Sequence, residues 1–183
     1  QAWFQYNASK KYMVIPKHID LNDLVLAREL ASILSWFQKG ETGEGRIVHQ
    51  ARTSRDPLID AAFAEAMELY IAEEGKHAKQ LGLLSKALGG APKTKLAAEK
   101  LFRNGRRAIG FRHKMLVLTV AEVIGLVSYE LIAEATDSAL VKEVLEEIAS
   151  DEREHLDLQA EFFANVVAES PPSLRALHAP ALL

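Results

Sequence analysis

The sequence predicts an all-α protein with four long antiparallel helices, arranged as two helix hairpins that a longer crossover joins. Two observations support this fold class. Apolar residues recur at alternating spacings of four and three over long stretches, as on the buried seam of a bundle helix. Turn-forming residues separate these stretches, and none of them has the two-residue alternation of a β-strand.

The chain is expected to form one domain of residues 1–183, because its 183 residues are enough for a single core. Within it we expect an N-terminal arm (1–19), a helical bundle (20–168) and a C-terminal tail (169–183). The net charge of -3 has no basic excess, so we expect no nucleic-acid partner. The absence of cysteine excludes disulfides and thiolate chemistry, and it favours a cytoplasmic location.

Residues 1–19 contain aromatic residues and a proline without a sustained period, so they predict an extended or partly helical arm across the bundle. The first bundle helix is expected to begin with Asp20 or Asn22 as its N-cap. The glycine-rich stretch 40–45 would normally end a helix. Because one heptad stripe passes through it to Val48 and Ala51, we expect a continuous or bulged helix to about Arg52.

Asp56-Pro57 predicts the start of the second helix, with proline in the first helical position. This helix should run to Leu88 and stop at Gly89-Gly90. A basic connector follows over 93–105, with a helical turn near 96–102, and two further helices are expected over 106–135 and 138–168.

The run from Met115 to Ala133 is the most apolar part of the chain and is long enough to cross a bilayer. Glu122 and Glu130 interrupt it, and carboxylates at the centre of a membrane are rare. We therefore expect a helix buried in a soluble bundle and no membrane partner.

The motif Glu-x-x-His occurs twice, at Glu74/His77 and at Glu152/His155. Each pair lies in the middle of an expected helix, on its apolar seam, where residues three apart are neighbours on one face. The motif alone is a weak indicator of a metal site, but its occurrence on two helix seams is a stronger one.

Each motif also has a seam glutamate on the preceding helix. Glu41 lies 15 residues before the turn at Asp56, and Glu74 lies 18 residues after it. Glu122 and Glu152 lie 15 residues on either side of the turn at Asp137. Since an antiparallel hairpin brings residues equidistant from its turn to the same height, each glutamate should face a Glu-x-x-His motif.

Together, the two hairpins would place four carboxylates and two imidazoles at one level of a dry core. Buried carboxylates need pairing or a cation, and four of them balance two divalent ions. Oxygen and nitrogen ligands without sulfur suit iron or manganese. The constellation therefore predicts two iron ions, or manganese and iron, as the cofactors.

At these residues, the chain resembles the ferritin-like di-iron carboxylate superfamily, which includes rubrerythrin, the ribonucleotide reductase small subunit and acyl-carrier-protein desaturases. The resemblance covers about residues 20–168 and implies a ferritin-like antiparallel four-helix bundle. It implies that catalysis proceeds through six metal ligands, with Glu74 and Glu152 as bridges: Glu41, Glu74, His77, Glu122, Glu152 and His155.

The resemblance also implies residues around the ligands. Asp151 would hydrogen-bond His77, and Glu73 is the candidate for the same role toward His155. Glu44 is either a seventh carboxylate ligand or a solvent-facing residue. Two tyrosines lie on the seam near the site, where core tyrosines with one hydrogen bond are common, and a glycine would leave room for a ligand or O₂: Tyr70, Tyr129 and Gly125.

Leu81 stands where the reductase has its radical tyrosine, which argues against radical storage. Rubrerythrin's cysteine-ligated iron module is absent, so electrons would come from an external donor. Glu29 becomes the alternative first-helix ligand only if the glycine stretch breaks that helix, and the histidines off the seam carry no predicted role: His18, His49, His113 and His178.

Three functions follow from these observations. The first is an oxidoreductase, of oxygenase or peroxidase type, that activates O₂ or reduces peroxide. The second is a ferroxidase, iron-storage or metal-handling protein, and storage would need a hollow shell of many subunits. The third is a non-catalytic helical bundle that binds a partner. A homodimer is left open as the assembly.

Overall fold

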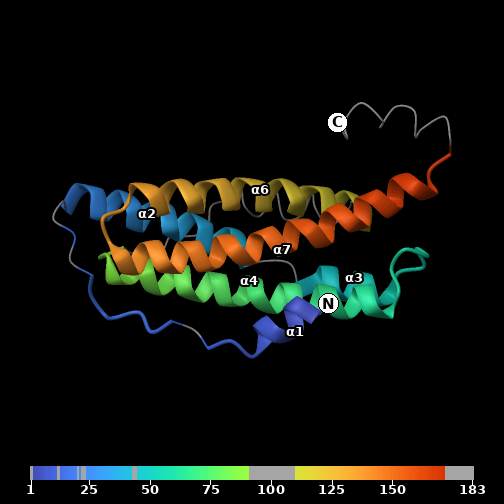
Figure 1. Cartoon of the computed structure of the whole chain (residues 1–183), viewed down its shortest axis with the longest axis horizontal. Coiled ribbons are helices and arrows are strands. Elements are labelled where there is room, and N and C mark those ends of the chain that lie inside the picture. Colours follow the sequence, from blue (N-terminus) through green and yellow to red (C-terminus); the bar gives the residue numbers. More distant parts are fainter. Residues whose placement is uncertain are drawn as a thin grey trace.

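The computed structural model describes residues 2–11, 13–19, 21, 24–42, 45–90 and 110–171, and these residues form helices, turns and coil without a strand (Figure 1). The predicted all-α class is therefore confirmed for this part of the chain. Its helices are α1 (Ala2–Ala8), α2 (Leu24–Glu41), α3 (Gly45–Thr53), α4 (Ala61–Ala87), α6 (Phe111–Ala135) and α7 (Ala139–Glu169).

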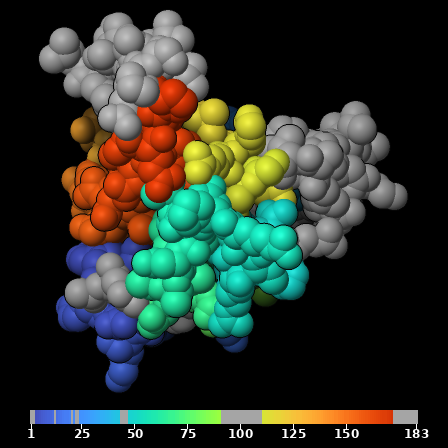
Figure 2. Space-filling view, turned by 90° about the vertical axis from the view of Figure 1, so that its right-hand side faces the viewer, coloured from blue at the N-terminus to red at the C-terminus, as the bar shows by residue number. Residues whose placement is uncertain are grey.

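The four long helices run along the long axis of the molecule (Figure 1). The most extensive contacts join α6 with α7 and α2 with α4, so these helices pack as two pairs. This arrangement is compatible with a four-helix bundle built from two hairpins. The shorter α1 and α3 both pack against α4, and Figure 2 shows the end of the molecule where α3 and α4 lie beside α6 and α7.

Local sequence signals set most helix ends. Ser138 caps α7 by accepting a hydrogen bond from the Val141 N–H at 3.4 Å. The predicted stop of α4 is confirmed, because Gly89 adopts a φ of 80°, which a side chain would disfavour.

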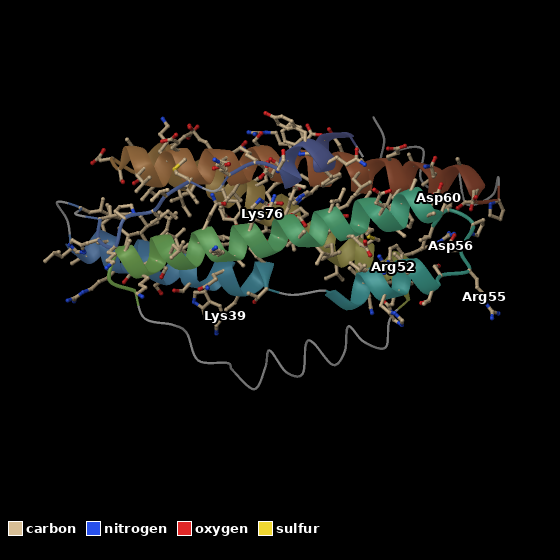
Figure 3. The ribbon with its side chains drawn as sticks, turned by 90° about the horizontal axis from the view of Figure 1, so that it is seen from below. Lys39, Arg52, Arg55, Asp56, Asp60 and Lys76 are labelled. Carbon is tan, nitrogen blue, oxygen red and sulfur yellow. The ribbon has the colours of Figure 1, made fainter. Side chains whose placement is uncertain are left out.

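The predicted start of the second helix is wrong. Helix α4 begins at Ala61, and its N-cap is Asp60, whose Oδ1 accepts the Phe63 N–H at 2.7 Å. Asp56 instead accepts the Leu58 N–H in a turn and receives two bonds, at 2.7 and 2.9 Å, from Arg112 on α6. Figure 3 shows Asp56 and Asp60 in the segment that joins α3 to α4.

The expected continuous helix through the glycine stretch is also wrong. Helix α2 ends at Glu41 and α3 begins at Gly45. Glycine gives the chain more backbone freedom than any other residue, so a cluster of glycines favours a break over a bulge. After the break, the buried face of α3 carries Ile47 and the predicted Ala51, whereas Val48 of the predicted stripe is only half-buried.

Two apolar clusters fill the core, one toward each end of the bundle. The first is formed mainly by α2, α4, α6 and α7 and includes Leu34, Leu84 and Leu145. The second joins α1, α3, α4, α6 and α7 and includes Phe4, Met67 and Phe162. The buried acidic residues and histidines of α4 and α7 lie between these clusters along each helix.

Helix α6 is buried on one side only. In its most apolar 18-residue window, 28% of the residues are buried, which differs from the expected core helix. By length and composition, it is the one helix of the described residues that could cross a membrane, so the exclusion of a membrane partner stays a prediction. Its exposed apolar side chains are Leu116, Val120, Val123, Ile124, Val127 and Leu131.

Several predictions lie outside the described residues. They concern the first-helix caps Asp20 and Asn22, the extra carboxylate Glu44, the connector 93–105 and most of the tail, from residue 172. The predicted arm is partly helical, since it contains α1, and this helix packs on α4.

We expect Asp60→Ala to lower the free energy of unfolding by about 0.5–2 kcal/mol, because the first turn of α4 would lose its cap. Urea denaturation measures this loss. Asp157→Ala, on the exposed face of α7, is the control and should change stability by less than about 0.5 kcal/mol. Equal losses in both variants would contradict the capping role of Asp60.

Candidate metal centre

The structure brings six of the sequence-predicted side chains together in the middle of the bundle. They form two overlapping groups, in each of which the possible ligand atoms lie within 4.8 Å of one another. The first group is Glu41, Glu74, His77 and Glu152, and the second is Glu74, Glu122, Glu152 and His155. Glu74 and Glu152 belong to both groups, as a pair of bridging ligands would.

Each helix pair contributes three of the six side chains. Glu41 is the last residue of α2 and meets the Glu74/His77 motif of α4. Glu122 lies in the middle of α6 and meets the Glu152/His155 motif of α7. Their meeting follows from the similar distance of each glutamate and its motif from the intervening turn.

Both histidines are held by a carboxylate from the other helix pair. His77 Nε2 on α4 lies 3.2 Å from Asp151 Oδ2 on α7, and His155 Nε2 on α7 lies 3.0 Å from Glu73 Oε2 on α4. With Nε2 engaged in this way, Nδ1 of each ring faces the shared carboxylates. The Nδ1 of His77 is 3.2 Å from Glu152, and that of His155 is 2.9 Å from the same residue.

Two buried tyrosines hold the carboxylates that are not shared. The Tyr70 hydroxyl donates to Glu122, and the Tyr129 hydroxyl donates to Glu41. Both bonds cross between the helix pairs, since Tyr70 lies on α4 and Tyr129 on α6. The tyrosines are therefore core residues whose single hydrogen bond orients a candidate ligand.

Helix α1 contributes residues that sequence reasoning missed. Asn7 donates its side-chain N–H to Glu73, and its backbone carbonyl accepts a bond of 2.8 Å from Lys76 in the middle of α4 (Figure 3). The Phe4 ring stacks on His155, with 5.8 Å between ring centroids. No motif marked these residues, because their role depends on where the arm packs.

Three buried atoms at the centre make no well-aligned hydrogen bond to the described residues: Glu74 Oε1, His77 Nδ1 and Glu152 Oε1. They are close to one another and to His155, with His77 Nδ1 3.2 Å from Glu152 Oε1. Buried polar atoms are nearly always paired, so unpaired atoms that converge on one point indicate a missing partner. Each of these atoms is a good ligand for a divalent cation. The residues present therefore fit a metal pair.

Burial and neighbouring carboxylates disfavour charge on the two unshared glutamates. Burial raises the pKa of Glu122 to about 8, and the hydrogen bond with Glu152 adds to this effect. Burial and the adjacent Glu74 raise the pKa of Glu41 well above its usual range. Both shifts favour the protonated form of these carboxyl groups in the metal-free protein.

The shared glutamates and the histidines show the opposite charge preference. Burial alone would raise the pKa of Glu74, but the adjacent imidazoles of His155 and His77 lower it to about 2. The pKa of Glu152 is likewise lowered, against its burial, by Glu122 and the two histidines. Burial lowers the pKa of His77 and His155, but their carboxylate partners outweigh it and raise both pKa values.

The remaining predicted residues lie around the centre or away from it. Gly125 is buried beside Tyr129, whose ring carbon Cε2 would lie 3.4 Å from an added Cβ. Glu29 is exposed on α2, so the break at the glycine stretch does not make it a ligand, and Glu41 keeps this place. His49 and His113 are exposed and lie outside both groups.

Comparison with protein-family models, with curated proteins and with solved structures finds no match for this chain. The side chains themselves therefore carry the functional argument.

We expect the melting temperature of the metal-free protein to fall as the pH rises from 6 to 8.5. Glu41, Glu122, His77 and His155 have folded-state pKa values above their unfolded ones. The stabilisation from such groups is complete below the unfolded pKa and is lost as the pH rises through the folded one. The shared glutamates, with lowered pKa values, are fully charged by pH 6 and add no slope.

Thermal unfolding of chelator-treated protein across this range measures the slope, and Glu122→Gln should flatten it by removing one titrating group. With divalent metal bound the slope should reverse, because metal binding displaces the protons. A metal-free protein that becomes more stable toward pH 8.5 would contradict the charge assignment.

Proposed function

We propose that this chain is a dinuclear metal oxidoreductase, of the ferritin-like di-iron type, that activates O₂ or reduces peroxide. The observation that carries the proposal is the pair of four-residue ligand groups that share Glu74 and Glu152. A structural core has no need for unpaired carboxylate and imidazole atoms at one point, and two adjacent cations would pair them.

The donor set supports two divalent ions of iron or manganese. Four carboxylates carry four negative charges when deprotonated, which two divalent ions balance, and the described ligand atoms are oxygen and nitrogen only. In the metal-free protein, the raised pKa values of Glu41, Glu122 and the histidines favour protons at these groups, which would reduce the negative charge instead. Deprotonation of these groups on binding is the exchange expected at a metal site.

A pair of redox-active ions, once bound, would supply electrons to O₂ or peroxide. The protein's own groups would hold that pair in place. Asp151 and Glu73 keep both imidazoles with Nδ1 toward the centre. The Tyr70 and Tyr129 hydroxyls orient the outer carboxylates, which are those of Glu122 and Glu41. The sequence has no cysteine that could hold a cysteine-ligated iron module, so the electrons would come from an external donor.

The cytoplasmic location, the absence of nucleic-acid and membrane partners, and the homodimer belong to the same proposal. The location rests on the absence of cysteine, and the absence of a nucleic-acid partner rests on the net charge of -3. The absence of a membrane partner rests on Glu122 and Glu130 within the apolar run, and the homodimer is left open.

The experiment that tests the proposal is metal analysis of protein grown with iron and manganese. We expect about two ions per chain in the wild type. Glu74→Ala and Glu152→Ala should each lose both ions, because each carboxylate serves both groups. Glu122→Ala should lose one ion preferentially. Glu130→Ala is the matched control, because Glu130 lies on α6 like Glu122 but is partly exposed and pairs with Arg153 of α7, and this variant should keep both ions.

A wild type without metal, whose melting temperature is unchanged by chelator and by Glu74→Ala, would overturn the proposal and favour a non-catalytic bundle.

The choice of oxidant is tested on the metal-loaded, reduced protein by following its optical spectrum after mixing with O₂ or hydrogen peroxide. We expect a change within seconds with at least one of them, and none in Glu152→Ala. Turnover with an added reductant distinguishes an oxidoreductase from a ferroxidase, which would consume only added ferrous ions. Reaction with neither oxidant would contradict the proposed activity.

A further inference from the structure

A cavity of about 250 Å³ lies between α2, α4 and α6, next to the candidate metal centre. Its polar lining consists of Glu41, Glu74 and Glu122 from the centre, together with Tyr70. Because Glu74, Glu122 and Tyr70 are buried, these residues form its inner end. A molecule in this cavity would therefore reach the candidate ligands of both groups.

The walls beyond these polar residues are apolar, and they include Phe37, Ile71 and Leu118. Apart from the three glutamates, the described residues of the lining contain no charged side chain. A phosphate or carboxylate group would find no cation among them and would face negative charge when the glutamates are ionised. Ligand pockets usually have volumes of about 300–1,000 Å³, so this smaller cavity suits a small molecule or the end of a chain.

The opposite end of the cavity opens to the surface. There, Trp36 on α2 is 47% exposed and Ile124 on α6 is 57% exposed, which is unusual for large apolar side chains. This opening continues into the exposed apolar side of α6 described above. An apolar molecule could thus pass from the surface to the centre without leaving apolar contacts.

A glycine lies at the opening on α2. A Cβ added at Gly40 would meet no atom of the described residues within 4 Å, so their packing does not require glycine at this position. Glycine weakens a helix relative to alanine, so a glycine at position 40 lowers the stability of α2, and no contact of the described residues requires it. The missing side chain leaves the opening free.

We propose that this cavity is the substrate site of the metal centre and that it takes an uncharged apolar molecule, or the aliphatic end of a longer one. This inference rests on the proposed function, because the centre at the inner end is what would make a bound molecule a substrate. It narrows that function toward an organic substrate and away from peroxide alone.

The test uses a series of linear alcohols, from 1-butanol to 1-octanol, as probes of the metal-loaded protein in calorimetric titrations. Affinity should rise about fourfold with each added methylene until the cavity is filled, as expected for burial of an alkyl chain. Gly40→Leu should weaken 1-hexanol binding at least tenfold, because the new side chain occupies the opening. Ala121→Leu, on the α6 wall, should weaken it as well.

Gly75→Leu is the matched control. Gly75 is also an exposed helical glycine with no atom within 4 Å of an added Cβ, but it lies outside the cavity lining. This variant should bind 1-hexanol as the wild type does, and all three variants should keep about two ions per chain.

Two results would overturn the inference. If the metal-loaded wild type binds no alcohol, or if Gly40→Leu and Ala121→Leu bind 1-hexanol as tightly as Gly75→Leu, the cavity is not the binding site. Either result leaves the proposed metal centre intact. If the wild type holds no metal, the proposed function fails, and this substrate site fails with it.

Discussion

Charge balance among six ionisable side chains in the interior constrains the rest of this structure. Four carboxylates and two imidazoles share one level of the bundle, with apolar clusters toward both ends. In the metal-free protein, the raised pKa values of the histidines and of Glu41 and Glu122 favour protons that offset the charge of Glu74 and Glu152. Divalent cations can replace such protons. The stability of the fold and the proposed metal binding therefore depend on the same side chains.

The two sides of the centre are built differently. On the side of α4 and α7, α1 covers it, with Phe4 stacked on His155 and Asn7 bonded to Glu73. On the side of α2 and α6, the cavity reaches the surface beside Trp36 and Ile124. The covered side keeps the imidazoles in one orientation, while the open side gives access. A metal centre that acts on an organic substrate would need both a covered side and an open side.

The accuracy of the sequence predictions followed the strength of the periodic signal. The placement of both Glu-x-x-His motifs on the buried faces of α4 and α7 was predicted correctly, because seam residues recur every three or four positions and the buried face of a helix depends on that period. Predictions failed where two local signals competed. Asp56-Pro57 resembles a helix start, yet Asp56 pairs with Arg112 on α6, and the cap passes to Asp60. The stripe through the glycine stretch suggested continuity, but backbone freedom ended the helix at Glu41.

The sequence by itself determined the helical class, the two Glu-x-x-His motifs and their distances from the turns, because helix period and hairpin register are local properties. It also placed the six candidate ligands at one level. Only the tertiary structure decided that Tyr70 and Tyr129 hold the outer carboxylates, that α1 supports Glu73, and that a cavity opens between α2 and α6. Those features depend on contacts between helices from separate parts of the chain, and no spacing along the sequence encodes which side chains meet there.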